Sequence, residues 1–209
     1  MVAASPSTAR HRRRERTRYE LAEAAVRLIE ANGFAATTVE EIALAADYSA
    51  STFFRLFTRK EDAVLFDMPD RLDALRASIT APSGWPALRA ALLDHARTWE
   101  AGDPAFAAAR VRLLHREPAL KSRYLDYCDQ YEDWLAGLLG TQRAGDGWAA
   151  DVDIRLTAAS IVACLRAAFH AQASAAEADV PSAAAYLSHA FDTLERGLLS
   201  SWEPGGANR

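Results

Sequence analysis

Three helix-start signatures follow one another between residues 38 and 61. Thr38 with Glu41, and Thr58 with Glu61, have the spacing of a capping box, and Ser49 is placed to cap a helix between them. The segment therefore predicts a helix, a short turn and a second helix, an arrangement that often places a helix in the major groove of DNA. Short capped helices also occur in alanine-rich bundles, so a purely structural origin stays open.

The second predicted helix, residues 50–55, carries small and polar side chains of the kind that face a DNA groove. Ser51 and Thr52 can donate hydrogen bonds to phosphates or bases. Ala50 can lie against a thymine methyl group, and Arg55 can reach a phosphate or a guanine edge. We expect a small apolar core to hold the two helices together, built from Ile42, Leu44, Leu56 and Phe57.

Basic residues concentrate at the N-terminus. Residues 1–60 hold 10 Lys+Arg and 7 Asp+Glu, whereas the remaining chain holds 14 and 21, so the formal net charge of −4 combines a basic end with an acidic body. This asymmetry predicts one part that binds a polyanion and one with another task. We expect arm residues such as Arg13 and Arg14 to contact DNA, with a solvated tail as the alternative.

Lys60 is one of two lysines in the chain and falls in the first turn of a predicted helix. A cation there opposes the helix dipole, so a bound phosphate would stabilise it. The alternative is a solvated surface lysine.

The composition predicts an all-α protein, and the helix signals along the chain predict about nine helices. The chain has 46 Ala and 23 Leu but only 13 Val+Ile, so strong helix formers greatly outnumber β-branched residues. One of these helices is expected to begin near Thr58 and continue past Leu75. We divide the chain into a flexible basic arm (1–13), a helix-turn-helix domain (14–60) and an all-helical effector and dimerisation domain (61–209).

Several classes are disfavoured by what the sequence lacks. The sequence contains no run of 18 uncharged apolar residues, so it predicts no membrane span. No apolar segment follows the basic N-terminus, as one would in a secretory signal. P-loop, GxSxG, HExxH and GxGxxG patterns are absent, and Cys128 and Cys164 lack metal-ligand spacing. We expect a cytoplasmic, non-enzymatic protein without catalytic residues, metal, cofactor or membrane partner.

Residues 18–66, and especially 35–43 and 49–62, resemble the DNA-binding domain of TetR-family transcriptional regulators. The resemblance implies three DNA-binding helices, a connecting fourth helix, and a larger helical domain that dimerises and binds an effector. By position it implies phosphate contacts at Thr38, Phe54 and Lys60. It also implies a recognition helix formed by Ser49, Ala50, Ser51, Thr52, Phe53, Phe54 and Arg55.

Two residues depart from the family pattern. Asp47 stands in the turn where the family usually has Gly or Ala; Asp tolerates unusual turn dihedrals, so we expect the turn to form. Phe54 replaces the more usual Tyr and removes a hydroxyl contact to phosphate.

The last two predicted helices carry apolar stripes that suggest a two-fold four-helix dimer interface. Burial inside one subunit is the alternative. The expected interface residues are Leu165, Phe169, Leu187, Phe191, Leu194 and Leu198.

The helices between the two ends combine aromatic and polar side chains, as ligand pockets do. We expect an effector site lined by Trp85, Trp99, Phe106, Arg110, Tyr131 and Trp134. Residues 112–123, the pattern at Trp134 and the helix over 153–169 resemble mycofactocin-regulator-type C-terminal domains, a subgroup associated with acyl-CoA-like ligands.

These expectations combine into a homodimeric repressor that binds a palindromic operator and is released by a small hydrophobic or acyl-CoA-like effector. It would be nucleoid-associated when bound to DNA. The alternatives are an activator of the same architecture and a helical small-molecule-binding protein without DNA activity.

Overall fold

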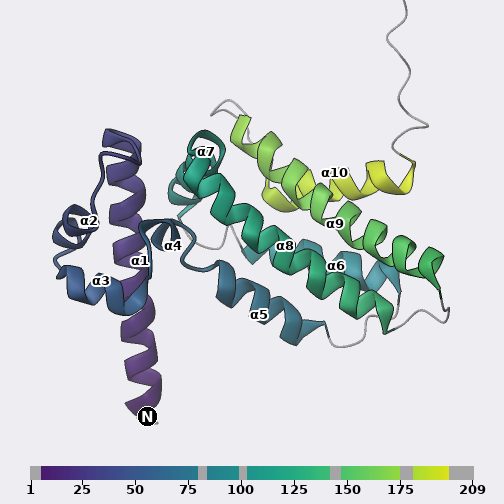
Figure 1. The fold of residues 1–209 in the computed structure, drawn as a ribbon, viewed down its shortest axis with the longest axis horizontal. Coiled ribbons are helices and arrows are strands. Elements are labelled where there is room, and N and C mark those ends of the chain that lie inside the picture. Colours follow the sequence, from purple (N-terminus) through teal and green to yellow (C-terminus); the bar gives the residue numbers. More distant parts are fainter. Residues whose placement is uncertain (1–5, 80–83, 99–102, 142–146, 175–180, 198–209) are drawn as a thin grey trace, which may run out of the picture. The chain divides into compact units, whose positions relative to one another are not determined.

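The computed structural model describes residues 6–79, 84–98, 103–141, 147–174 and 181–197. Within these ranges the chain forms ten α-helices and no strand, which confirms the all-α fold (Figure 1). The helices are α1 (Pro6–Asn32), α2 (Val39–Ala45), α3 (Ala50–Leu56), α4 (Lys60–Val64), α5 (Met68–Ser78), α6 (Trp85–Thr98), α7 (Pro104–Arg116), α8 (Pro118–Gly140), α9 (Trp148–Ser174) and α10 (Ala183–Glu195).

The chain divides into two compact units. The first takes in the chain up to Asp70 together with Ala108–Leu125, and the second takes in Arg71–Ala107 and the chain from Asp126 onward. Residues 61–70 and 108–125, which were expected in the second domain, belong to the same unit as the helix-turn-helix.

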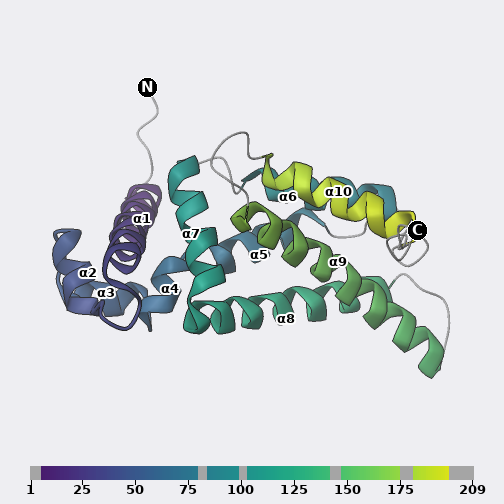
Figure 2. The same cartoon turned by 90° about the horizontal axis from the view of Figure 1, so that it is seen from above.

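Helix α1 is the longest element of the first unit, and α2 and α3 lie beside it (Figures 1 and 2). It begins at Pro6, so the described part of the expected flexible arm is helical. Proline is well tolerated in a first helical turn because its missing N–H has no partner there. The helix ends at Gly33, whose φ of 86° gives the left-handed conformation that glycine adopts without strain.

The first two cap predictions are confirmed. Thr38 and Glu41 form a reciprocal capping box at the start of α2, and the Ser49 hydroxyl accepts the Thr52 N–H at the start of α3. Asp47 has a φ of 61°, so the turn uses the unusual dihedrals that were expected. The third cap begins one residue later than predicted.

That third cap involves different residues from Thr58 and Glu61. The Arg59 backbone N–H donates to the Asp62 carboxylate at 3.1 Å, and α4 begins at Lys60.

The single helix expected to run past Leu75 is instead broken into α4 and α5. Pro69 has no N–H for the Leu65 carbonyl, and its ring would clash with that carbonyl in a continuous helix. The Met68 N–H donates to Leu65 O at 3.0 Å instead of to Val64 O, its acceptor in a continuous helix. The Val64 carbonyl accepts from the Arg110 Nε–H at 2.8 Å. This break explains the tenth helix.

The core of the helix-turn-helix follows the prediction except at Leu44. Ile42 and Phe57 are buried and Leu56 is half-buried, but Leu44 is 76 % exposed. Phe53 fills the core instead, because its ring is fully buried and lies 5.3 Å from the Phe57 ring centroid.

In the second unit, α10 packs against α9 and α6, and Figure 2 shows α6 and α10 side by side. Leu187 and Phe191 are buried inside the subunit, and the Phe191 ring meets Trp85 edge-on with centroids 5.1 Å apart. These two residues are therefore unavailable for a dimer interface, which corrects the prediction for them. Leu165, Phe169 and Leu194 are half-buried, and Leu198 lies outside the described residues.

Among the described residues, no helix has the length and apolar character needed to cross a membrane.

The Thr38–Glu41 capping box gives a pH-dependent prediction. Hydrogen bonds from the Thr38 backbone and hydroxyl lower the pKa of Glu41 from its usual 4.5. A carboxyl whose pKa is lower in the folded state adds stability above its unfolded pKa, and this contribution disappears as pH falls through the folded pKa. We expect Glu41→Gln to flatten the fall in unfolding free energy between about pH 6 and pH 3, measured by urea unfolding with circular dichroism.

The matched control is Glu40→Gln, which removes the neighbouring exposed carboxylate without touching the box. Equal pH dependence in the two variants would contradict a specific role for Glu41.

Candidate nucleic-acid interface

Helix α3 presents one face to solvent and one to the core. Ser51, Phe54 and Arg55 are exposed, and Ala50 and Thr52 are half-exposed. The exposed residues include polar side chains that can reach bases or phosphates. Phe53 is fully buried, so the prediction that it contacts DNA is wrong; the adjacent Phe54, 55 % exposed, is the aromatic residue on the outer face.

Thr38 is exposed at the start of α2, but its polar groups are engaged. Its hydroxyl donates to Glu41 Oε2 at 2.9 Å, and its backbone N–H donates to the same oxygen at 2.8 Å. A phosphate at this position would have to share or displace these contacts with Glu41.

Lys60 is partly committed to the loop between α1 and α2. Its Nζ donates to Phe34 O at 2.5 Å and Thr37 O at 2.9 Å, and it lies 4.0 Å from the centroid of the Phe34 ring. An ammonium group has three N–H donors, so one is left for a phosphate. The structure thus gives Lys60 a local role that the sequence did not suggest.

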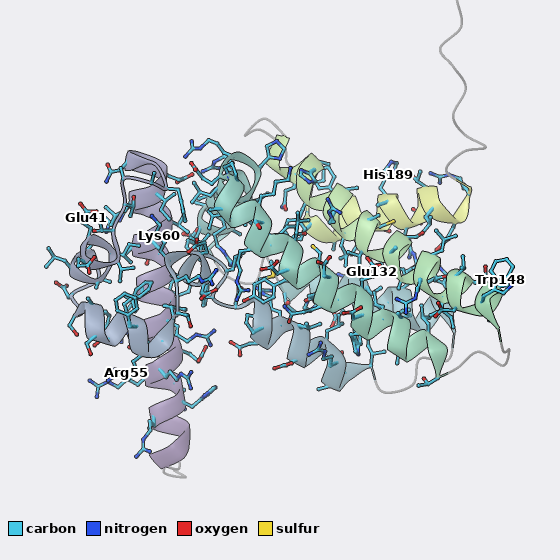
Figure 3. The ribbon with its side chains drawn as sticks, viewed as in Figure 1. Glu41, Arg55, Lys60, Glu132, Trp148 and His189 are labelled. Carbon is cyan, nitrogen blue, oxygen red and sulfur yellow. The ribbon has the colours of Figure 1, made fainter. Side chains whose placement is uncertain are left out.

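A basic hollow of about 720 Å³ lies between the first half of α1 and α3. The labelled Arg55 extends from α3 beside α1 in Figure 3. Among the described residues, four arginines and no acidic residue line the hollow, so its walls attract an anion. The lining residues are Arg10, Arg13, Arg14, Thr17, Tyr48, Thr52, Arg55 and Leu56.

From the sequence, Arg13, Arg14, Thr52 and Arg55 were predicted to lie at the interface, whereas Tyr48 and Thr17 were not. The missed signal was the helix start at Pro6, which puts residues four apart on one face of α1. With that helix in place, Arg10 aligns with Arg14 and Arg13 aligns with Thr17.

Several of the residues expected to line an effector site are already engaged by other groups within their own unit. Arg110 belongs to the first unit, is 3 % exposed, and donates to Val64 O and to both Asp67 oxygens. A ligand would have to displace these partners, so Arg110 is a structural residue rather than part of a pocket.

The other expected effector residues lie in the second unit or outside the described ranges. The Trp85 indole donates to Glu195 at 2.6 Å, and the Tyr131 hydroxyl lies 2.9 Å from His95 Nε2. Phe106 and Trp134 are half-buried, and Trp99 is among the residues the structure does not describe. In the described ranges, no cluster of three or more His, Cys, Asp or Glu side chains could hold a metal ion.

Comparison with known proteins gives matches along the chain. Residues 21–65 match the family of bacterial regulatory proteins of the tetR type, and residues 83–199 match the MftR C-terminal domain. The chain is similar to the HTH-type transcriptional regulator TcmR of Streptomyces glaucescens, with 31 % identity over 95 % of this chain and 91 % of that protein.

The fold is similar to that of a crystallised TetR-family regulator from Mesorhizobium loti. The TM-score is 0.50 at 22 % identity, covering 90 % of this chain and 98 % of that one. The helix-turn-helix, its exposed recognition helix and the two matched segments agree: the chain belongs to the TetR family of DNA-binding transcriptional regulators.

Proposed function

We propose that the chain is a homodimeric repressor that binds a palindromic operator in the cytoplasm and leaves it when a small hydrophobic or acyl-CoA-like effector binds. The basic hollow between α1 and α3 is the observation that carries DNA binding. Three of its arginine side chains lie on α1, and the fourth, Arg55, lies on the recognition helix, where Ser51 is also exposed. Activation from the same operator is the alternative.

The two walls of the hollow would have different tasks on DNA. Arginine contacts to phosphate fix position and orientation, whereas the exposed side chains of α3 can read base edges. Arg10, Arg13 and Arg14 on α1 would supply the phosphate contacts, and Arg55 would reach a phosphate or a base edge from α3.

We place the proposed dimer interface on the outer face of α9. Trp148, Val152 and Leu156 are 82, 50 and 63 % exposed, and they follow one another at four-residue spacing. Figure 3 shows Trp148 extending from the start of α9. Large apolar side chains exposed side by side commonly mark a protein interface.

The same face of α9 continues with small residues, and this pattern is self-complementary. Ala163 and Ala167 are exposed and Ala159 is half-exposed. In an antiparallel pair about a two-fold axis near residues 157 and 158, Trp148 would face Ala167 of the second copy, Val152 its Ala163 and Leu156 its Ala159. Large side chains would then pack on small ones at each position.

The effector proposal rests on the match of residues 83–199 to the MftR C-terminal domain and on the aromatic residues of that segment. Ligand sites are mostly apolar with a few polar groups, which suits an acyl chain carrying a polar head.

Replacing two arm arginines tests the DNA interface. Each phosphate contact contributes about −0.9 to the slope of log Kobs against log salt, so Arg13→Ala with Arg14→Ala should reduce the magnitude of the slope by up to about 1.8 for each bound subunit, or about 3.6 for the dimer. We expect affinity for a selected operator and for random duplex DNA to fall together, as measured by fluorescence anisotropy over a salt series.

Arg76→Ala with Arg97→Ala removes the same charge from exposed positions of the second unit and is the matched control. A slope unchanged in the arm variant, or reduced equally in the control, would contradict a direct contact.

Leu156→Asp tests the dimer surface. Burying an unpaired carboxylate at a two-fold contact is costly, so we expect a folded monomer by light scattering. Thr157→Asp, on the next exposed residue around the helix, should leave the dimer intact. Phe191→Asp should instead lower the melting temperature, because its ring is in the subunit core. A folded Leu156→Asp variant that stays dimeric would rule out this face.

A thermal shift with palmitoyl-CoA tests the effector class. A ligand at about 100 times its Kd stabilises the folded state by about 2.7 kcal/mol, or roughly 5–10 °C for a chain of this size. We expect such a shift below the micellar concentration and none with free CoA. No shift across a series of acyl chain lengths would contradict the acyl-CoA assignment and leave DNA binding unaffected.

A further inference from the structure

Tyr48 connects the start of the recognition helix to α1. Its backbone N–H donates to Ala43 O at 2.8 Å at the end of α2, and its hydroxyl donates to Glu20 Oε2 at 2.6 Å on α1. Asp47 turns the chain just before it, and Ser49 caps α3 just after it. One side chain therefore ties the turn of the helix-turn-helix to the long helix behind it.

The acceptor of this tether is itself held in place. Arg16 Nε lies 2.8 Å from Glu20 Oε1, and hydrogen bonds from Tyr48 and Arg16 lower the pKa of Glu20. The carboxylate is therefore charged at neutral pH, and hydrogen bonds to a charged group are shorter and stronger than neutral ones. The Thr17 hydroxyl, 3.3 Å from the Tyr48 hydroxyl, adds a second partner one turn from Arg13 and Arg14.

Tyr48 also lies between two hollows of opposite charge. It lines the basic hollow described above and a second hollow of about 510 Å³. The second hollow carries three carboxylates and one arginine, so a phosphate is attracted to one side of Tyr48 and repelled from the other. Its lining residues are Glu20, Glu23, Ala24, Arg27, Ala45, Ala46, Asp47 and Tyr48.

We propose that Tyr48 is a positioning residue for DNA recognition: its hydrogen bond to Glu20 sets the placement of the recognition helix relative to the arginines of α1. This inference rests on the proposed DNA-binding function. Base contacts need a helix placed to within a fraction of an ångström, whereas long arginine side chains adapt to a phosphate that has moved slightly. Loss of the tether therefore reduces the discrimination between DNA sequences while the phosphate contacts persist.

The test uses Tyr48→Phe in the full chain, with an operator first selected by the wild type from a random duplex library. We expect the affinity for the operator to fall about tenfold, since a hydrogen bond to a charged group is lost. Affinity for random duplex DNA and the salt slope stay at the wild-type values. Tyr186→Phe, which removes a hydroxyl from α10, is the matched control and should behave as the wild type.

Glu20→Gln separates positioning from simple support of the fold. Its amide oxygen can still accept from Tyr48, so selectivity should fall less than in Tyr48→Phe. An unchanged ratio of operator to random affinity in Tyr48→Phe overturns the proposal. An equal loss for both DNAs with a lower melting temperature also overturns it, because Tyr48 would then only support the fold. If the wild type selects no sequence, DNA recognition itself fails, and this inference fails with it.

Discussion

Two backbone carbonyls at the break between α4 and α5 organise the first unit. Val64 O and Phe66 O need donors because Pro69 interrupts the helix, and an unpaired buried carbonyl is costly. Arg110 from α7 donates to the first and Arg18 from α1 to the second. Arg110 also pairs with Asp67 and Arg18 with Asp70, so each guanidinium closes a charge pair as well. Removing one partner of a buried pair such as Arg110–Asp67 costs about 3–5 kcal/mol. Arg110, together with the Arg112–Glu30 and Arg123–Asp62 ion pairs, connects residues 108–125 to the unit that holds the DNA-reading helices.

The arginines of the first unit consequently divide into two kinds, which a charge count along the sequence cannot separate. Arg18, Arg110 and Arg123 pair with carboxylates inside the unit. The arginines of the basic hollow share it with no acidic residue in the part of the chain that the structure describes. Only the second kind supplies a field that attracts a polyanion, because a paired arginine is largely neutralised by its carboxylate. The basic N-terminal segment thus predicted the right partner, while the surface that would bind it is set by how each arginine is paired.

Two of the three local caps were read correctly from the sequence, whereas the third cap, the helix break at Pro69 and the long-range contacts were not. The Thr38 box and the Ser49 cap depend on residues within a few positions of one another. Phe53 is buried and Phe54 is exposed because of how α3 packs. Two adjacent phenylalanines in a sequence do not show which of them faces the core. An apolar stripe such as that of α10 predicts burial but does not say whether the same chain or a second copy supplies the cover. The role of Arg110 was hidden for the same reason, since its partners lie more than forty residues away.

The helical start of α1 changes what kind of interface the basic hollow can be. A flexible arm adapts to many DNA shapes and loses conformational freedom when it binds. Arginines on a helix are instead presented at fixed spacing, so less freedom is lost, but their distance from α3 must already suit the DNA. That distance is a property of the contacts between α1 and the turn before α3, where Tyr48 meets Glu20 and Thr17. The hydrogen bonds of Tyr48 therefore matter for recognition, because arginines held on a helix cannot compensate for a change in the distance between α1 and α3 as a flexible arm could.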